Sequence, residues 1–417
     1  MLALIDCNNF YASCEHLFNP KLEKKPLVIL SNNDGCVIAR SQKAKALGIK
    51  MGEPAYQLRE RISSGEIQML SSNFTLYADM SQRVMQTLSS FSSDMEVYSI
   101  DEAFFLLGDS PDLREKGIAM LQKVKKWTGI PISIGIAPTK TLAKLANEAA
   151  KKEKAYEGVY VLSDPKAIEE RLARTALEDI WGIGGQLSLK LNKQGIYTAQ
   201  QLRMSDDHWI RKLLGVTGYR TVLELRGTPC IELMEEPEKK KSIVCSRSFS
   251  KKVESLHLLE EALASFASRA AEKLREQKSR AGFLSVFIAT SPFQEPYVAR
   301  SCHIQIPNPT SYTPELIAYA KEGLAKIYQP ELGYKKAGVL IGDFIDEGAE
   351  PLDFLTPNPA NDKRTRAMEI LDAVNARYDK EAIRFAAEGV ERQWKSGARG
   401  SISPKFTTSW HELLKVK

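Results

Sequence analysis

Two adjacent acids, Asp101 and Glu102, interrupt the apolar stretch VYSIDEAFFLL (97–107), whose other residues favour a pair of buried β-strands. Adjacent carboxylates repel each other, and removing them from water is costly unless a positive charge offsets them. A bound cation would supply that charge. A third acid, Asp6, ends the apolar run LALID (2–6). Adjacent residues of a regular strand face opposite sides, so a tight turn at 101–102 is needed to bring all three carboxylates to one site.

Three carboxylates on the surface of a sheet suit hard, oxygen-seeking cations such as Mg²⁺. Two such ions, about 3.5–4 Å apart, catalyse in-line phosphoryl transfer, one at the attacking hydroxyl and the other at the leaving phosphates. The acids alone leave a second interpretation open, in which Asp6, Asp101 and Glu102 are unrelated surface residues. The hypothesis of a phosphoryl-transfer site therefore depends on neighbouring residues.

Residues near Asp6 have the chemistry to bind a nucleotide. The segment NNFYASCE (8–15) follows directly, and backbone amides at the start of a helix there could hold a triphosphate. We expect Phe10 and Tyr11 to lie beside the nucleotide sugar, and Lys45 and Lys151 are available as phosphate-binding cations. The alternatives are ordinary packing for Tyr11 and a solvated helix face for each lysine.

The hydrophobic pattern predicts the elements that hold these residues. Strands are expected at 2–6, 97–107 (a pair), 131–137 and 159–162, and helices at 76–91, 112–127 and 139–152. Two further strands, 27–32 and 36–39, joined by the turn signal NNDG, belong to an inserted subdomain. This order matches a βαββαβ, ferredoxin-like unit with an insertion.

The remainder of the chain predicts a helical region, a linker and a second αβ unit. The helical pattern of 166–230 is interrupted by WGIGG (181–185), and EEPEKKKS (235–242) is a polar, basic linker. Strands are then expected at 243–249, 283–290 and 335–344, and helices at 257–278 and 313–328. Beyond Glu350 the chain is rich in Pro and Asn, so 350–362 is predicted to be an exposed tether. The fold class is a multidomain α/β (α+β) protein.

Composition narrows the class of protein. The 417 residues are 43% hydrophobic and 26% charged, as in an ordinary soluble protein of several domains. No apolar run approaches 18 residues and no basic segment precedes Asp6, so neither a transmembrane helix nor a signal peptide is expected. The six cysteines lack CxxC or zinc spacing, which indicates reduced thiols in a cytoplasmic protein. The net charge of +6 mildly favours a polyanionic partner.

The motifs of this chain, taken in order, resemble those of Y-family (translesion) DNA polymerases, in detail the UmuC-type catalytic subunit of DNA polymerase V. The motifs include ALIDCNNFYASCE (3–15), LSNNDGCVIAR (30–40), VYSIDEAF (97–104), GIAPTKTLAKLANEAAKK (135–152), DIWGIGG (179–185), YKKAGVLIGDF (334–344) and SPKFTTSW (403–410). The resemblance covers essentially the whole chain. It implies a palm (1–10 and 76–165), fingers (11–75), a thumb with a helix–hairpin–helix (166–234), a linker (235–242), a little finger (243–349) and a partner-binding tail (350–417).

The resemblance also implies roles for individual residues. Asp6, Asp101 and Glu102 would be the catalytic metal ligands for two Mg²⁺ ions, with the backbone carbonyl of Cys7 as a fourth ligand. Tyr11 would be the steric gate that excludes ribonucleotides, with Asn9 and Phe10 beside it in the nucleotide site. Lys45 and Lys151 would bind the triphosphate. Many relatives carry a Tyr on the triphosphate where this chain has Gln42, so contacts on that side differ.

Two segments are expected to bind DNA. Gly182 and Gly184 of WGIGG free backbone amides to approach a phosphate, although a helix-terminating glycine is the alternative. Six basic residues and no acid lie between 239 and 253, and the alternative there is a solvated linker. These six residues are Lys239, Lys240, Lys241, Arg247, Lys251 and Lys252.

The predicted reaction is template-directed attack of a primer 3′-hydroxyl on a dNTP, in damage (SOS) tolerance and mutagenesis, without a proofreading exonuclease. A nucleotidyl cyclase and a non-catalytic DNA scaffold are the rival functions; the DNA-binding elements argue against the first, and the intact acids argue against the second. By resemblance the tail engages a processed UmuD-type dimer, a RecA-type filament and a sliding clamp, the last through Leu352, Phe354 and Leu355. The tail is therefore expected to be dispensable for chemistry in a cytoplasmic, nucleoid-associated enzyme.

Overall fold

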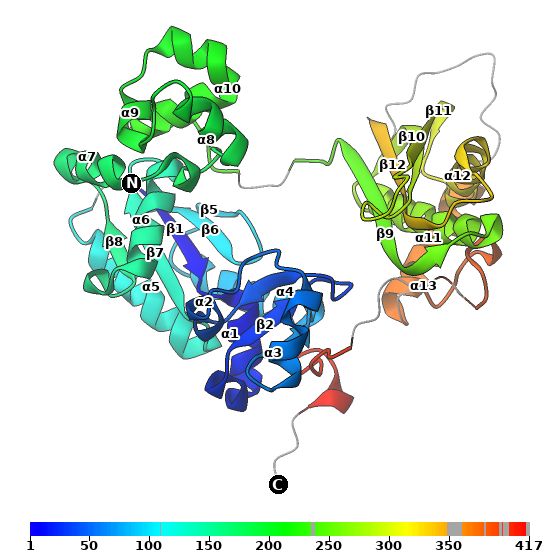
Figure 1. The fold of residues 1–417 in the computed structure, drawn as a ribbon, viewed down its shortest axis with the longest axis horizontal. Helices are drawn as coiled ribbons and strands as arrows, with labels where there is room; N and C mark the ends of the chain where they lie inside the picture. The colour runs from blue at the N-terminus through cyan, green and yellow to red at the C-terminus, as the bar shows by residue number, and fades with distance from the viewer. Residues whose placement is uncertain are drawn as a thin grey trace. The chain divides into compact units, whose positions relative to one another are not determined.

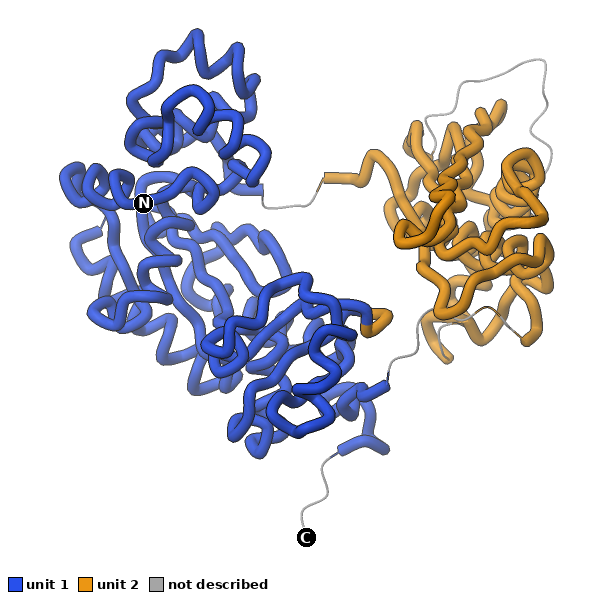
Figure 2. The backbone as a smooth tube through the Cα atoms, viewed as in Figure 1, with its two compact units in different colours: residues 1–31, 35–237, 400–417 blue, residues 32–34, 238–399 orange. Residues whose placement is uncertain are grey.

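The computed structural model describes residues 1–108, 110–234, 238–347, 361–378, 381–391, 394 and 400–413. The chain forms two compact units (Figure 2). The first contains residues 1–31, 35–237 and 400–417, and the second contains residues 32–34 and 238–399. The chain therefore leaves the first unit, builds the second and returns to the first at its C-terminal end.

A five-stranded sheet forms the centre of the first unit (Figure 1), with the strand order β5-β6-β1-β7-β8. β1 is antiparallel to both β6 and β7, whereas β7 and β8 are parallel. The bounds are β1 Leu2–Cys7, β5 Met95–Val97, β6 Glu102–Leu106, β7 Ile132–Ala137 and β8 Val159–Val161. The strands predicted at 2–6, 131–137 and 159–162 are confirmed, and the 97–107 run is indeed two strands.

Helices cover both faces of this sheet. Ala3, Ile5 and Cys7 lie in a core with α4 (Phe74–Ser89) and α5 (Leu113–Thr128). Leu4, the intervening residue, lies in a second core with α6 (Lys140–Lys152), which runs along β1 and β7 (Figure 1). Because side chains alternate along a strand, Asp6 points to the α6 side of the sheet.

The inserted subdomain contains a small sheet with the order β3-β2-β4. Strands β2 (Leu27–Leu30) and β3 (Val37–Arg40) are antiparallel, as the NNDG turn signal predicts. β4 (Gln68–Ser71) pairs parallel to β2 and was not predicted. The helical segments here are α1 Phe10–Phe18, α2 Gln42–Ala46, α3 Arg59–Ser63 and the 3₁₀ turns Pro20–Lys24 and Ala55–Leu58.

The region from 165 to 225 is helical, as expected. Its α-helices are α7 Pro165–Arg174, α8 Gly185–Asn192, α9 Ala199–Arg203 and α10 Asp207–Leu225, with a 3₁₀ turn at Leu177–Asp179. A further 3₁₀ turn, Lys154–Tyr156, precedes β8. α10 is kinked at Gly215, whose φ of 71° is left-handed. Such backbone is unfavourable for residues with a Cβ atom, so a glycine stands at the kink.

The second unit is an antiparallel sheet, ordered β11-β10-β12-β9, packed on helices α11 and α12. The bounds are β9 Ser242–Val253, α11 Leu256–Glu276, β10 Ser279–Ala289, β11 Ala299–Thr310, α12 Thr313–Ile327, β12 Tyr334–Asp346, α13 Asn361–Arg377 and the 3₁₀ turn Ala386–Glu388. β11 was not predicted, because its polar sequence ARSCHIQIPNPT contains two prolines and little apolar alternation.

The predicted tail, 350–417, is divided between the two units. In the second unit, Asp372 forms an ion pair of 2.7 Å with Arg275, and the buried Trp394 belongs to the core. Residues 400–413 pack on the first unit instead. A single separate tail is therefore not what the described residues form. Most of the 350–362 tether, with Leu352, Phe354 and Leu355, lies outside the described residues.

Among the described residues, no helix is long and apolar enough to cross a membrane.

Candidate active site

Asp6 and Glu102 are direct cross-strand partners at the end of the β1–β6 pair. Phe104, two residues after Glu102, lies in the same core as Leu4, so both acids point to the α6 side of the sheet. Their side chains are 13% and 20% exposed, which leaves each carboxylate largely removed from water. The strand register thus brings together two acids that are far apart in the sequence.

Asp101 lies in the turn before β6 rather than on the strand. The backbone amides of Tyr98 and Ser99 both donate to the Glu102 carbonyl, which closes the turn. The Ser99 hydroxyl donates to Asp101 Oδ1 at 2.7 Å, and the Cys7 amide donates to the Asp101 carbonyl at 2.8 Å. Because Asp101 lies in the turn, its side chain does not follow the alternation of the strand, and its carbonyl is hydrogen-bonded to the end of β1. The sequence predicted a turn at 101–102.

Two lysines of α6, seven residues apart and so on one face of the helix, neutralise the paired acids. Lys151 Nζ lies 2.6 Å from Asp6 Oδ2, and Lys144 Nζ lies 3.0 Å from both Glu102 oxygens. Lys144 also lies over the rings of Tyr98 and Trp181. Over the described residues, no group of three or more His, Cys, Asp or Glu side chains is arranged to hold a metal ion. Each predicted ligand that faces α6 is satisfied by an ammonium.

The charges around Asp6 show how crowded this site is. Burial raises the pKa of Asp6 to about 6; the Lys151 ammonium lowers this pKa, and the negative charges of Glu102 and Asp101 raise it. Glu102 and Asp101 therefore both lie within electrostatic reach of Asp6.

The predicted nucleotide residues separate into buried and accessible ones. Phe10 is 3% exposed and lies in the core, so its ring does not reach the site, which corrects the expectation for this residue. Cys7 is also buried, which leaves its backbone as the group that could serve the site. Asn9 begins α1 with a left-handed φ of 50°, and its side chain makes no capping hydrogen bond. Tyr11 is half-buried. Its pKa is raised mainly by burial and to a smaller extent by the negative charge of Asp101.

Lys45 and Arg40 extend the positive charge of the site beyond Lys151. Burial lowers the pKa of Lys45, the charges of Arg40 and Lys151 lower it further, and Asp6 raises it. The Arg40 guanidinium donates to the Ile49 carbonyl at 2.5 Å. Lys45 thus lies within electrostatic reach of Arg40, of Lys151 and of Asp6, and clustered cations of this kind suit a triphosphate. Sequence reasoning missed Arg40 and Lys144; the seven-residue spacing of Lys144 from Lys151 was the available signal.

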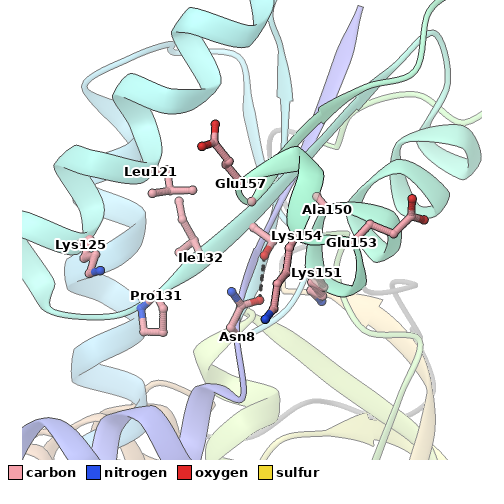
Figure 3. A pocket seen from close by; sticks show the side chains of 12 residues that line it. Asn8, Leu121, Lys125, Pro131, Ile132, Ala150, Lys151, Glu153, Lys154 and Glu157 are labelled. Carbon is pink, nitrogen blue, oxygen red and sulfur yellow. Dashed lines mark hydrogen bonds between the residues drawn. The ribbon is translucent and has the colours of Figure 1, made fainter. Parts of the chain in front are cut away.

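A cavity of about 380 Å³ is lined in part by Lys151, the ion-pair partner of Asp6 (Figure 3). Asn8, Lys125 and Lys154 also line it. The Ser133 hydroxyl donates to Asn8 Oδ1 at 3.0 Å. Because Asp6, Asp101 and Glu102 are not among its lining residues, this cavity is a neighbour of the candidate active site.

The WGIGG segment packs against the acid-bearing sheet through its tryptophan. Trp181 lies 5.6 Å from the Tyr98 ring and 6.2 Å from the Phe104 ring, measured between centroids. Gly182 has a left-handed φ of 88°, which explains a glycine there, and Gly184 is the N-cap of α8. A Cβ atom added at Gly184 would have no heavy atom within 4 Å, so this backbone is open to approach.

The six predicted basic residues are exposed or partly paired. Lys239 forms an ion pair of 2.7 Å with Asp346, whereas Lys251 and Lys252 are exposed near the end of β9. Arg247 Nη1 donates to the Ser246 carbonyl. Lys240 and Lys241 are also exposed. Four lysines are therefore positioned for a partner without breaking a described ion pair.

Comparisons with known proteins identify the family of this chain. The impB/mucB/samB family model matches residues 5–148, its C-terminal domain matches 240–354, and a domain of unknown function matches 365–416. Protein UmuC of Salmonella typhimurium is 44% identical over 423 residues, covering all of both chains. The chain belongs to the impB/mucB/samB family. Protein ImpB of Salmonella typhimurium is 41% identical over 99% of each chain.

More distant relatives place this family among DNA polymerases. DNA polymerase IV 1 of Bacillus subtilis is 31% identical over 54% of each chain. A Y-family DNA polymerase chimera of Dbh and Dpo4 has a TM-score of 0.67 at 22% identity, covering 83% of this chain and 99% of its own. An insertion ternary complex of Dbh DNA polymerase covers the same shares at 21% identity, with a TM-score of 0.53.

These matches confirm the predicted resemblance and fold class, with palm, fingers and thumb in an α/β multidomain chain. This member of the impB/mucB/samB family is a DNA-directed DNA polymerase of translesion synthesis in damage-induced mutagenesis. Y-family polymerases are nucleotidyltransferases that use divalent metal ions.

Proposed function

We propose that this polymerase extends a primer by attack of its 3′-hydroxyl on the α-phosphate of a dNTP, at the site formed by Asp6, Asp101 and Glu102. The observation that carries the proposal is the cross-strand pairing of Asp6 with Glu102, with Asp101 in the adjoining turn. Three carboxylates at one end of a sheet have no evident packing role, whereas phosphoryl transfer uses them.

The donor set fits Mg²⁺, because the three carboxylates and the Cys7 carbonyl are all hard oxygen ligands. Two ions held there would lower the pKa of the primer hydroxyl and neutralise charge on the phosphates. In this structure, Lys151 forms an ion pair with Asp6, and Lys144 forms one with Glu102. We expect these ammonium groups to leave the acids when cations arrive, which frees Lys151 for the triphosphate alongside Lys45.

Tyr11 is proposed as the gate that excludes ribonucleotides, with the start of α1 at Asn9 and Phe10 contributing backbone amides beneath the phosphates. The Tyr11 ring is partly accessible and close enough to Asp101 to feel its charge. A ring that excludes the ribose 2′-hydroxyl by its bulk must stay in place. The stacking of Tyr11 on Tyr77 would therefore contribute to sugar selection.

DNA contact is proposed for Gly182 and Gly184 of the thumb hairpin, and for the basic residues from Lys239 to Lys252 of the linker and β9. The palm, fingers, thumb and little finger would follow the boundaries predicted from the sequence. The C-terminal partners would be a processed UmuD-type dimer, a RecA-type filament and a sliding clamp, and the enzyme would act on the nucleoid in the cytoplasm during SOS mutagenesis.

Primer extension with the purified full chain, with accessory partners present, tests the proposal. Template-directed extension supports it. Cyclisation of a nucleotide without primer would favour a nucleotidyl cyclase, and DNA binding without either reaction would favour a scaffold.

A further inference from the structure

Residues 400–406, named the C-terminal strap, attach to the edge of the inserted three-stranded sheet. The Ser71 amide at the end of β4 donates to the Ser401 carbonyl at 2.9 Å, and the Ser401 amide donates to Ser71 Oγ at 3.1 Å. Ile402 forms a parallel bridge with Ser71. The buried Phe406 stacks on Phe18 of α1, with 4.9 Å between ring centroids. Backbone and side chain thus both hold the strap.

Ser403 of the strap joins two elements next to the nucleotide site. Its hydroxyl donates to Glu15 Oε1 on α1 at 2.9 Å. The Asn73 side-chain amide donates to the Ser403 carbonyl and to its Oγ, both at 3.0 Å. Asn73 is also the N-cap of α4, accepting from the Leu76 amide. The strap therefore fixes the start of α4 against α1.

Glu15 is a buried acid that depends on hydroxyl donors. It is 1% exposed, and the Tyr77 hydroxyl donates to the same Oε1 atom at 2.7 Å. Burial raises the pKa of Glu15, and the hydrogen bonds from Tyr77 and Ser403 lower it. A buried carboxylate that loses a hydrogen-bond donor is less favourable in its buried position, because fewer hydrogen bonds then offset the cost of removing it from water.

Tyr77 carries the effect to the gate. The fully buried Tyr77 ring stacks on the Tyr11 ring, with 4.3 Å between centroids and 13° between planes. The hydrogen bond from the Tyr77 hydroxyl to Glu15 fixes the position of the Tyr77 ring, and Tyr11 packs against a face of that ring. An unbroken series of contacts runs from Ser403 through Glu15 and Tyr77 to Tyr11.

We propose that the C-terminal strap is part of the nucleotide site, and that Ser403 and Glu15 are positioning residues that set sugar selectivity through Tyr77 and Tyr11. This inference rests on the proposed role of Tyr11 as the gate. It assigns to the end of the chain a function in the core that the predicted partner-binding tail does not include.

The test compares kcat/KM for one dNTP and its matching ribonucleotide, in primer extension by the full chain with accessory partners. Ser403→Ala should lower discrimination about tenfold, because a loosened Tyr77 lets Tyr11 yield. Ser403→Thr keeps the hydroxyl and should restore the ratio. Trp410→Ala removes an 88% exposed ring of the same C-terminal segment and should leave the ratio unchanged. A purely structural loss would lower both rates alike and not their ratio.

Tyr11→Ala separates the two levels of the proposal. If it changes discrimination and Ser403→Ala, shown to be folded by its melting temperature, does not, the strap has no role in selectivity and the inference is overturned. If Tyr11→Ala has no effect either, the gate itself is wrong, and the inference is rejected with it. Should Ser403→Ala fail to fold, Ser403→Cys, which is nearly isosteric and a weaker donor, replaces it with the same two outcomes.

Discussion

At the scale of single residues, Asp101 is distinguished from its neighbour by backbone geometry. Glu102 starts β6 and faces α6, while Asp101 sits in the turn, held by Ser99 and by the Cys7 amide. The Cys7 hydrogen bond uses the Asp101 carbonyl, so a change of the side chain leaves the link between β1 and the turn intact. This separates the chemistry of Asp101 from its structural role.

Asp101→Asn should therefore reduce single-nucleotide addition by about a hundredfold or more, because one negative charge facing the cations is removed. DNA binding, measured by fluorescence anisotropy, should change little. Asp112→Asn is a matched control at the start of α5, beyond the opposite end of β6, and should extend primers normally. Wild-type extension by Asp101→Asn would show that Asp101 is not a metal ligand.

Single substitutions can separate the bulk of the Tyr11 ring from its hydroxyl group. Tyr11→Ala removes the ring and should raise relative ribonucleotide incorporation roughly a hundredfold, whereas Tyr11→Phe keeps the bulk and should remain selective. Competition between labelled ribonucleotide and deoxyribonucleotide on one primer–template measures this. Equal loss of selectivity in both variants would mean that the hydroxyl, rather than the bulk, discriminates.

At the scale of elements, the close approach of α6 to β7 puts the two lysines within reach of the acids. A Cβ atom added to Gly135 of β7 would lie 2.1 Å from the Asn147 amide nitrogen and 2.4 Å from the Ala143 carbonyl oxygen. Asn147 in turn donates to the carbonyls of Leu4 and Ser133. Because Gly135 has no side chain, α6 can pack closely against β1 and β7.

Gly135→Ala should push α6 away and lower the free energy of unfolding of the first unit by about 3 kcal/mol. Calorimetry of the purified protein measures the change as a lower melting temperature. Gly185→Ala is the matched control, because a Cβ atom there meets nothing within 4 Å and the backbone is not left-handed. Equal melting temperatures for the two variants would contradict the close packing of α6.

At the scale of the whole molecule, the segment 239–253 carries six basic residues and no acid in a chain whose net charge is +6. Lys251 and Lys252 lie in solvent near the end of β9, while Lys239 is engaged by Asp346. Neutralising a phosphate releases counterions, so the number of phosphates that the protein neutralises can be measured from the salt dependence of DNA affinity.

Replacing Lys251 and Lys252 by Gln should weaken primer–template binding and reduce the slope of log affinity against log salt by about 0.9 for each phosphate that is no longer neutralised. Lys239→Gln should have a smaller effect, because its charge is already paired. Lys125 and Lys126 at the end of α5 provide a control that removes the same charge elsewhere. A slope that falls equally in the control would indicate a general charge effect instead of phosphate binding at β9.

The sequence predicted the elements whose signals are local. β1 and β7 are short, strongly apolar segments and α6 has a clear helical apolar spacing, so the predicted 2–6, 131–137 and 139–152 agree with the structure within a residue or two. The NNDG turn similarly predicted the β2–β3 pair. The motifs, read in order, predicted the family, because a motif records residue identity directly.

Contacts between distant segments followed from the tertiary structure alone. The register that opposes Asp6 to Glu102, the reach of Lys144, and the burial of Phe10 depend on how β1, β6 and α6 pack. The hydrogen bond from Ser403 to Glu15 joins residues 388 positions apart. Periodicity reports only on residues a few positions apart, so no local pattern could indicate that the C-terminal strap packs against α1 and the start of α4.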